Sequence, residues 1–439
     1  MKKASSEPAP SAKLIRGHTP KGVGPVFSRI ATFRRVSTAR LLNLFALWGY
    51  AEITLPAFEY LDSLGPGLDP ILQNKAYTLQ DRGSGHVLIL RPDATAQIAR
   101  LVAQGDAQTD PIQRYSYSTS VFRHEDHHIL ERELLQTGVE LFGEGGSRAD
   151  WEILSLCLEG AQRLGLSDPV LSLAHCGLQK SLLHLIGKNL SPDKKTDLQR
   201  FFYAHDSLVL SDLLSSRNKI DPQVLRSLDI LLGRTYNVEE ALELLRQDPI
   251  FNLSNEIAVQ ASYLVEILLL IAPGNRELIR VDFALNPSGP YYSGMIFHLY
   301  TKGTYQELAS GGRYDSLPAL FGRKIPATGF AFHMNRIEGI LSGLNEHEIA
   351  NGLEIMLPSD NPDIAERLSI LASDLRSLGV SVAFGQMSTG ASVHRADSIR
   401  CLLRWDGSGF LLSRPGLDPH PLRLENLDPE RIFSCLGNR

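Results

Sequence analysis

Hydrophobic and polar positions alternate with different periods along the chain, and the changes of period separate helices from strands. Apolar residues recur at helical spacing over 29–47, and Gly49 ends this predicted amphipathic helix. A short strand is predicted over 51–56, and its final proline indicates a strand end or a sheet edge. Residues 86–91 (HVLILR) are typical of a buried strand, which turns through a proline into a helix over about 93–102.

Two further strands are predicted on either side of a charged turn. Residues 113–125 and 132–142 are rich in aromatic, β-branched and leucine side chains, and HEDHHIL connects them. A helix is expected to follow, with Ser147 as its cap and Asp150 as an acidic residue in its first turn.

The middle of the chain changes to a helical pattern. Over about 178–272 leucines recur every three or four residues without glycine-rich loops, which predicts an all-helical insertion. Strands resume after it, and a glycine pair and a helix interrupt them before a last helix that carries Arg336. The predicted strands are 278–285, 291–300, 305–309 and 327–332.

The last part of the chain predicts a separate small domain. Strand, helix and strand patterns alternate beyond a linker at 342–352, which is typical of an α/β domain over 352–439. The first 21 residues lack an apolar core and are expected to be a disordered tail. The main domain is therefore predicted to cover residues 22–342.

Charge and cysteine content narrow the classes of function. A net charge of -5 argues against nucleic-acid binding, and residues 351–439 hold nine arginines, no lysine and eleven acids. The four cysteines lie far apart, which argues against a disulfide or zinc framework and fits a reducing cytoplasm. No apolar run is long enough for a membrane helix, so no membrane association is expected.

Polar side chains share one face of the strand 132–142. Arg132, Gln136 and Glu140 alternate with residues of the apolar face, and Arg123 continues the pattern on the preceding strand. Guanidinium, amide and carboxylate groups on a rigid sheet suit a zwitterionic amino acid. A solvated strand face is the alternative interpretation.

Two other segments carry candidate binding groups. Asp93 and Thr95 fall in the first turn of a predicted helix, where capping is the simpler interpretation and receipt of a ligand's ammonium group is the other. Tyr291 and Tyr292 lie between glycines, so one ring could cover a pocket while the other packs. The glycine pair 311–312 permits close backbone approach, but an ordinary turn explains it equally well.

A zinc-protease pattern, H-E-x-x-H, occurs at residues 124–128. That chemistry requires a helix that brings both histidines to one metal ion, whereas here β-favouring residues precede a polar turn. We therefore expect no metal.

Together these segments resemble the class II aminoacyl-tRNA synthetases of the histidyl type. WGYAEITLP resembles the first motif, which forms the dimer interface, and SVFRHEDHHILERELLQTGVELFG resembles the second. PATGFAFHMNRI resembles the third motif, and LRPDATAQIAR resembles the amino-acid-binding stretch, with Asp93 in place of glutamate. The resemblance covers about residues 22–341. It implies an α+β fold, in which helices flank an antiparallel sheet. The small C-terminal domain lies beyond the resemblance, and we interpret it as a relic of an anticodon-binding domain, because its acids outnumber its arginines, the opposite of the balance that RNA binding favours.

Carried over by position, the resemblance implies a pocket for free histidine. The implied lining residues are Asp93, Thr95, Arg123, Gln136, Glu140, Tyr291 and Tyr292.

Departures from the synthetase pattern affect the expected chemistry. Pro287 and Gly294 stand where the synthetase signature R-G-L-D-Y-Y-x-R has arginines, and His333 replaces a glycine of the third motif. Amino-acid activation needs cations where charge develops, so no catalytic residue or cofactor is expected, and the nucleotide cleft is expected to be narrowed.

VDFALNPSGPYYSGMIFHLY resembles the regulatory subunits of ATP phosphoribosyltransferase more closely than any synthetase. That family implies a non-catalytic protein of histidine biosynthesis, needed by a short-form catalytic subunit and for histidine feedback. It also implies a homodimer within a hetero-octamer. The alternative function is an active histidyl-tRNA synthetase.

Overall fold

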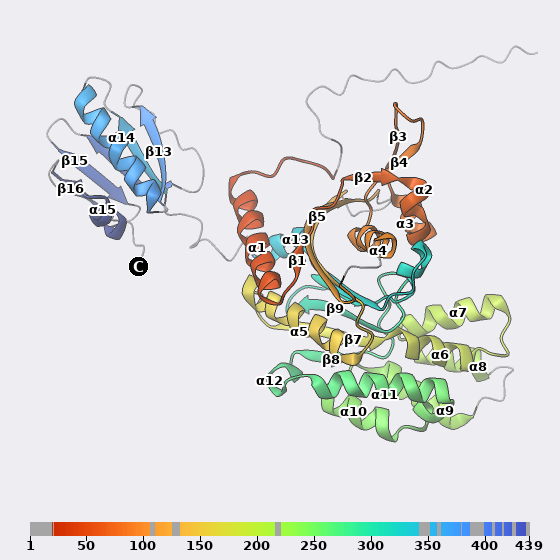
Figure 1. The fold of residues 1–439 in the computed structure, drawn as a ribbon. Coiled ribbons are helices and arrows are strands. Elements are labelled where there is room, and N and C mark those ends of the chain that lie inside the picture. The colour runs from red at the N-terminus through yellow and green to blue at the C-terminus, as the bar shows by residue number, and fades with distance from the viewer. Residues whose placement is uncertain are drawn as a thin grey trace, which may run out of the picture. The chain divides into compact units, whose positions relative to one another are not determined.

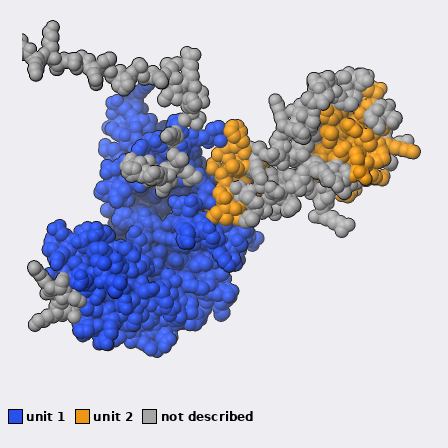
Figure 2. All heavy atoms as spheres, turned by 180° about the vertical axis from the view of Figure 1, so that it is seen from behind, with its two compact units in different colours: residues 1–25, 40–336 blue, residues 26–39, 337–439 orange. Residues whose placement is uncertain are grey.

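The computed structural model divides into two compact units, coloured separately in Figure 2. One unit contains residues 1–25 and 40–336, and the other contains residues 26–39 and 337–439. The structure describes residues 20, 22–105, 110–124, 132–215, 221–341, 352–357, 361–378, 380–386, 399–405, 409–414, 417–423 and 427–435. Almost all of the predicted tail, the turn 125–131 and the linker 342–351 lie outside these residues.

An eight-stranded sheet forms the centre of the larger unit (Figure 1), in the order β1-β5-β6-β11-β10-β9-β7-β8. Its strands are β1 (Ala51–Glu52), β5 (Gln113–Phe122), β6 (Glu133–Phe142), β7 (Pro169–His175), β8 (Ile279–Val281), β9 (Met295–Thr301), β10 (Ala309–Arg313) and β11 (Ala327–His333). The edge pairs β1–β5 and β7–β8 are parallel, and all other neighbours are antiparallel. The predicted α+β class, with an antiparallel sheet flanked by helices, is confirmed.

Four helices match predicted ones, and two of them pack against this sheet. α1 (Ser28–Leu47), α4 (Ala94–Gln104), α5 (Ser147–Leu164) and α13 (Met334–Leu341) lie close to the predicted positions, and α4 and α5 are the two that contact the sheet. α5 contacts β7, β10 and β11 and buries Ile153, Leu154 and Leu158. Its cap differs from the prediction, because Gly146 is the N-cap residue and Ser147 is already helical.

The glycine pair lies inside a strand and not in a turn, so the predicted strand 305–309 was placed too early. β10 includes Gly311 and Gly312, and a Cβ at Gly311 would overlap the carbonyl oxygen of Gly329 on the adjacent strand. Close approach of two backbones therefore requires glycine at position 311. The helix expected after this segment is only a 3₁₀ turn, η3 (Pro318–Phe321).

A second sheet of three strands has the order β2-β4-β3, with β2 (Phe58–Tyr60), β3 (Thr78–Gln80) and β4 (Val87–Leu90). The predicted buried strand is its middle strand. Ile89 is fully buried, but Val87 is 46% exposed, so only part of β4 belongs to the core. Short helices α2 (Leu61–Leu64) and α3 (Pro70–Lys75) follow β2, with the 3₁₀ turn η1 (Gly65–Gly67) between them.

The stretch between β7 and β8 contains only helices and turns in its described residues. We call it the helical region. It consists of α6 (Cys176–Ile186), α7 (Pro192–Tyr203), α8 (Ser207–Ser215), α9 (Pro222–Gly233), α10 (Val238–Gln247), η2 (Pro249–Asn252), α11 (Asn255–Leu270) and α12 (Pro273–Arg276). In Figure 1 it forms the yellow-green to green group of helices beside β7 and β8.

The smaller unit contains a five-stranded sheet in the order β13-β12-β14-β15-β16. Its elements are β12 (Gly352–Leu357), α14 (Pro362–Ser377), β13 (Ser381–Gln386), β14 (Ile399–Trp405), β15 (Phe410–Arg414), β16 (Leu417–Leu422) and α15 (Pro429–Cys435). β12 lies parallel to β13 and β14, whereas β14, β15 and β16 form antiparallel pairs. Leu353, Leu368 and Phe410 belong to its core.

Among the described residues, no helix combines the length and apolar character needed to cross a lipid bilayer.

Candidate ligand-binding site

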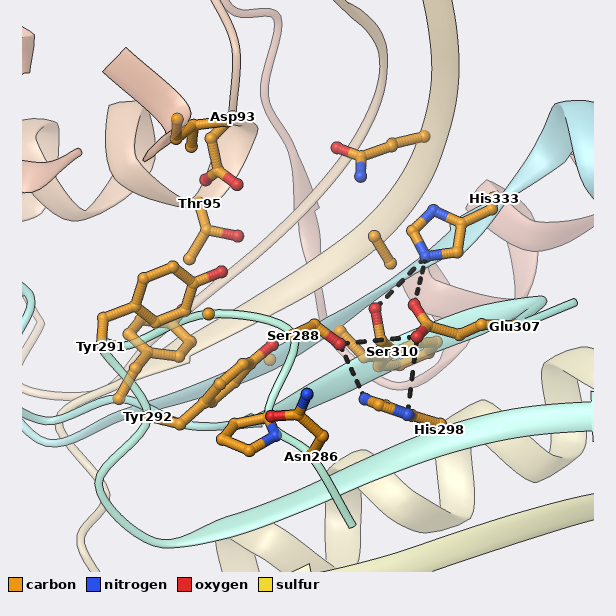
Figure 3. A pocket seen from close by; sticks show the side chains of 18 of the residues that line it. Asp93, Thr95, Asn286, Ser288, Tyr291, Tyr292, His298, Glu307, Ser310 and His333 are labelled. Atoms are coloured by element: carbon orange, nitrogen blue, oxygen red, sulfur yellow. Dashed lines mark hydrogen bonds and ion pairs between the residues drawn. The ribbon is translucent and has the colours of Figure 1, made fainter. Parts of the chain in front are cut away.

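A cavity of about 610 Å³ opens in the larger unit, and all seven predicted site residues line it. Figure 3 labels four of them, Asp93, Thr95, Tyr291 and Tyr292. They come from three separate parts of the chain: the start of α4, the strand pair β5–β6 and the segment before β9. The structure therefore brings the complete predicted set together at one cavity.

The strand pair places its polar side chains on one face, as the alternation predicts. Gln136 lies opposite Thr119, and Glu140 lies opposite Tyr115 in the antiparallel register. Side chains two residues apart point to the same side of a sheet, so Gln136 and Glu140 both line the cavity. This arrangement excludes the solvated strand face, since Glu140 is only 1% exposed.

Glu140 is surrounded by hydroxyl groups. Thr95 Oγ1 donates to Glu140 Oε1 at 2.6 Å, the Tyr117 hydroxyl donates to the same oxygen at 3.4 Å, and the Tyr314 hydroxyl donates to Oε2. Burial raises the pKa of Glu140 to about 8, although these hydroxyls favour the ionised form. The carboxyl group therefore holds a proton near neutral pH until a cationic partner enters.

Gln136 is 7% exposed, and its side chain forms no hydrogen bond with any residue that the structure describes. Its amide lines the cavity, where water or a ligand can supply partners for its donor and acceptor groups. Gln136 thus has polar atoms that are left for a ligand.

Asp93 is the N-cap residue of α4, where its Oδ1 accepts a hydrogen bond of 2.9 Å from the Ala96 amide. Its other oxygen lies 3.6 Å from the Arg123 guanidinium, which also donates to the Pro92 carbonyl. Capping therefore accounts for one Asp93 oxygen. It does not account for Thr95, whose hydroxyl turns toward Glu140.

Tyr291 and Tyr292 form an aromatic wall on the side of the cavity formed by the segment before β9. Their ring centroids lie 4.8 Å apart, and the Tyr291 ring meets the edge of the Tyr314 ring at 6.0 Å. Both residues line the cavity, and both also pack against the hydrophobic core beside it.

A second polar cluster lines the same cavity, labelled at the right of Figure 3. Glu307 Oε1 lies 2.9 Å from His333 Nε2, and Glu307 Oε2 lies 3.5 Å from His298 Nδ1. Ser288 contacts His298 Nε2 at 2.7 Å, and Ser310 contacts His333 Nε2 at 3.2 Å. His333, which is expected to narrow the nucleotide cleft, thus belongs to a connected network of side chains in the cavity.

Burial lowers the pKa of His298 and of His333, which favours the neutral form of both rings. Burial opposes ionisation of Glu307, but its two histidine neighbours outweigh that effect and lower its pKa. Sequence reasoning singled out only His333 of this cluster. Glu307 lay in a strand predicted too early, and no spacing related it to His298.

The two positions that depart from the synthetase signature carry no cation in the structure. Pro287 lines the cavity, and a Cβ at Gly294 would lie 2.9 Å from Cδ of the Arg313 side chain. Arg313 does not replace the missing charge, because it forms a buried ion pair of 2.9 Å with Asp150.

Within the described ranges, no group of three or more His, Cys, Asp or Glu side chains is arranged to hold a metal ion. The zinc-protease pattern cannot be followed further, since its residues 125–128 lie outside those ranges.

Comparison with known proteins gives two kinds of relative. A family model described as histidyl-tRNA synthetase matches residues 26–337. An ATP phosphoribosyltransferase regulatory subunit of Moorella thermoacetica is 32% identical over 391 residues, which covers 88% of this chain and 97% of that protein. One of Geobacillus kaustophilus is 30% identical over 410 residues, covering 92% and 99%.

Solved structures agree with this pattern. A Bacillus halodurans protein described as an ATP phosphoribosyltransferase regulatory subunit/histidyl-tRNA synthetase aligns with a TM-score of 0.73 and 26% identity, covering 87% of this chain and 95% of that one. Histidyl-tRNA synthetase from Nostoc shares the fold, with a TM-score of 0.74 at 18% identity, covering 96% and 100%. The chain belongs to the family of ATP phosphoribosyltransferase regulatory subunits, whose fold is that of histidyl-tRNA synthetase.

Proposed function

We propose that this protein is a non-catalytic regulatory subunit of ATP phosphoribosyltransferase that binds free histidine in the cavity. One observation carries the proposal: polar groups suited to an amino acid line the cavity, while Pro287 and Gly294 occupy the positions of the catalytic cations. Binding without activation is what a feedback sensor requires.

The lining groups divide by charge in a way that suits histidine. Asp93 and Glu140 can receive cationic groups, and the Arg123 guanidinium can pair with a carboxylate. The unpartnered Gln136 amide can donate and accept, which suits a ring nitrogen or an ammonium group. Entry of a cation beside Glu140 favours loss of its proton, so ligand binding restores the charge that burial suppresses.

The second polar cluster supports loss of synthetase activity. Burial disfavours the charged form of the two histidines beside the Glu307 carboxylate, so this cluster supplies little positive charge to the cavity. Arg123 and Arg336 also line the cavity, but Arg336 already donates a hydrogen bond of 2.7 Å to the Glu307 carbonyl. Stabilising an adenylate would require further cations at the reacting phosphate.

The partner is a catalytic subunit of the short form, which joins ATP to phosphoribosyl pyrophosphate in the first step of histidine biosynthesis. The relatives named as regulatory subunits support a catalytic partner. We further propose that the chain forms a homodimer within a hetero-octamer.

The decisive experiment uses the reconstituted complex with a short-form catalytic subunit. We expect the catalytic subunit to need this chain for activity and histidine to inhibit the complex. Glu140→Ala should raise the inhibitory histidine concentration about ten- to a hundredfold, because a hydrogen bond to a charged group contributes roughly 1.5–3 kcal/mol. Glu243→Ala on α10 is the matched control. Unchanged inhibition in Glu140→Ala would show that the feedback site lies elsewhere.

The alternative function, an active histidyl-tRNA synthetase, has a separate test. The isolated chain should show no histidine-dependent exchange of pyrophosphate into ATP, because each missing oxyanion-type donor costs on the order of a hundredfold in rate. Robust exchange would replace the regulatory proposal with the enzymatic one.

A further inference from the structure

One wall of the cavity has no regular secondary structure. Residues 282–294 are all described, and none of them lies in a helix or a strand. We call this segment the cavity wall. It contributes Leu285, Asn286, Pro287, Ser288, Gly289, Tyr291 and Tyr292 to the lining. Backbone hydrogen bonds hold its two ends, at Asp282 and at Ser293 and Gly294, and hydrogen bonds from side chains of other elements are left to hold the residues between them.

Two neighbouring residues of α6 provide such hydrogen bonds. Gln179 is 1% exposed, and its Nε2 donates to the Phe283 carbonyl at 3.2 Å and to the Leu285 carbonyl at 2.9 Å. Lys180 Nζ donates to the Tyr292 carbonyl at 2.7 Å. Two consecutive residues of α6 thus hold the cavity wall near its beginning, at Phe283 and Leu285, and near its end, at Tyr292.

Other parts of the helical region hold the beginning of the cavity wall. His205, in the turn between α7 and α8, lies 3.3 Å from Asp282. The Phe283 ring packs against Tyr236 and Phe251, with ring centroids 5.9 and 5.6 Å away. Phe283 therefore faces the helical region, while Leu285, two residues later, lines the cavity.

We propose that the helical region is part of the ligand-sensing apparatus, and that Gln179 and Lys180 are positioning residues that hold the cavity wall against the bound amino acid. The inference rests on the proposed histidine site. Coupling between two sites is reciprocal, so a ligand that stabilises the cavity wall also stabilises α6. Binding of histidine in the cavity thereby stabilises α6, which does not line the cavity.

The test compares histidine affinity by calorimetry on the full chain. Lys180→Met removes the donor at an exposed position, so the variant should fold with an unchanged melting temperature without ligand. We expect its histidine Kd to rise about five- to tenfold, as the loss of one hydrogen bond predicts. Lys180→Arg should restore much of the affinity. Gln179→Leu should weaken binding in the same direction.

Lys188→Met is the matched control, because this lysine is exposed in the same region and follows α6. Hydrogen exchange supplies a readout that a purely structural role would not change. Histidine should slow amide exchange in residues 281–294 and in α6 of the wild-type chain, and the effect on α6 should disappear in Lys180→Met.

The outcomes separate the two proposals. If the wild-type chain binds no histidine, the proposed ligand is wrong and this inference falls with it. If histidine binds equally to the wild type, Lys180→Met and Gln179→Leu, the histidine site stands and the positioning role is refuted.

Discussion

Thr95 donates a hydrogen bond of 2.6 Å to the carboxyl group of Glu140, which lies 45 residues further along the chain. The contact joins the first turn of α4 to the middle of the sheet, at the floor of the cavity. A hydroxyl that could have capped its own helix is used to orient a buried acid. The start of α4 and strand β6, which the sequence analysis related to amino-acid binding, are therefore joined directly at the cavity.

Replacement of Glu140 by glutamine should change how stability depends on pH. The folded-state pKa of about 8 lies above the ordinary value, so between about pH 4.5 and 8 the folded chain keeps a proton that the unfolded chain has lost. Wild-type stability should therefore fall relative to Glu140→Gln as pH rises through this window, by on the order of 4 kcal/mol in total. Urea unfolding at pH 5 and pH 8 measures this. Glu133→Gln, exposed on the same strand, is the control, and parallel pH profiles for wild type and Glu140→Gln would contradict the prediction.

Restoring an arginine at position 294 should not restore a synthetase. A side chain there meets Arg313 at distances of 2.9 to 3.2 Å, and Arg313 is fixed by its ion pair with Asp150. Gly294→Arg and Gly294→Ala should both overpack this site, which lowers the free energy of unfolding by about 1–3 kcal/mol and with it the melting temperature. Gly274→Ala is the control, since its Cβ would meet open space. Histidine-dependent pyrophosphate exchange by Gly294→Arg would show that the local packing can yield.

The ion pair between Asp150 and Arg313 should be costly to break from one side. The two side chains are 0% and 5% exposed, and Arg313→Met leaves a buried carboxylate without its cation. The expected loss is about 3–5 kcal/mol in the free energy of unfolding. The double variant Asp150→Asn/Arg313→Met should recover part of this loss. Calorimetry on the wild type, the two single variants Asp150→Asn and Arg313→Met, and the double variant measures the coupling between the two side chains. Arg234→Met, which breaks an exposed pair with Glu240, should change the melting temperature little.

His205 should stabilise the chain more at low pH than at high pH. Its hydrogen bond with Asp282 raises the pKa of the His205 imidazole, so the stabilisation is complete below about pH 6.5. It is lost as pH rises through the raised folded-state pKa. His205→Asn suits the test because residue 205 has φ +55°, which asparagine tolerates. The stability difference from wild type should shrink between pH 6 and 8.5, and His184→Asn, at an exposed position, is the matched control.

Much of the fold followed from local patterns. Apolar spacing predicted α1, α4 and the strand pair β5–β6 close to their observed bounds, and the start of α5 close to its observed start, because each has a strong period or a clear cap. The prediction was wrong at Gly311 and Gly312, because two consecutive glycines are compatible both with a turn and with a strand whose backbone lies close to its neighbour. Only the neighbouring Gly329 on β11 distinguishes them.

The sequence by itself determined which chemical groups the site contains, since side-chain alternation on β6 and the resemblance to histidyl-tRNA synthetases both pointed to Gln136 and Glu140. Tertiary structure alone decided the state of those groups. Glu140 is held by Thr95 and Tyr314, from segments that no local pattern connects to β6, and burial raises its pKa. Tertiary structure also brings Glu307 together with His298 and His333. It likewise places α6 against residues 282–294. Periodicity records which way a side chain faces, whereas hydrogen bonding and desolvation depend on residues brought together from distant parts of the chain.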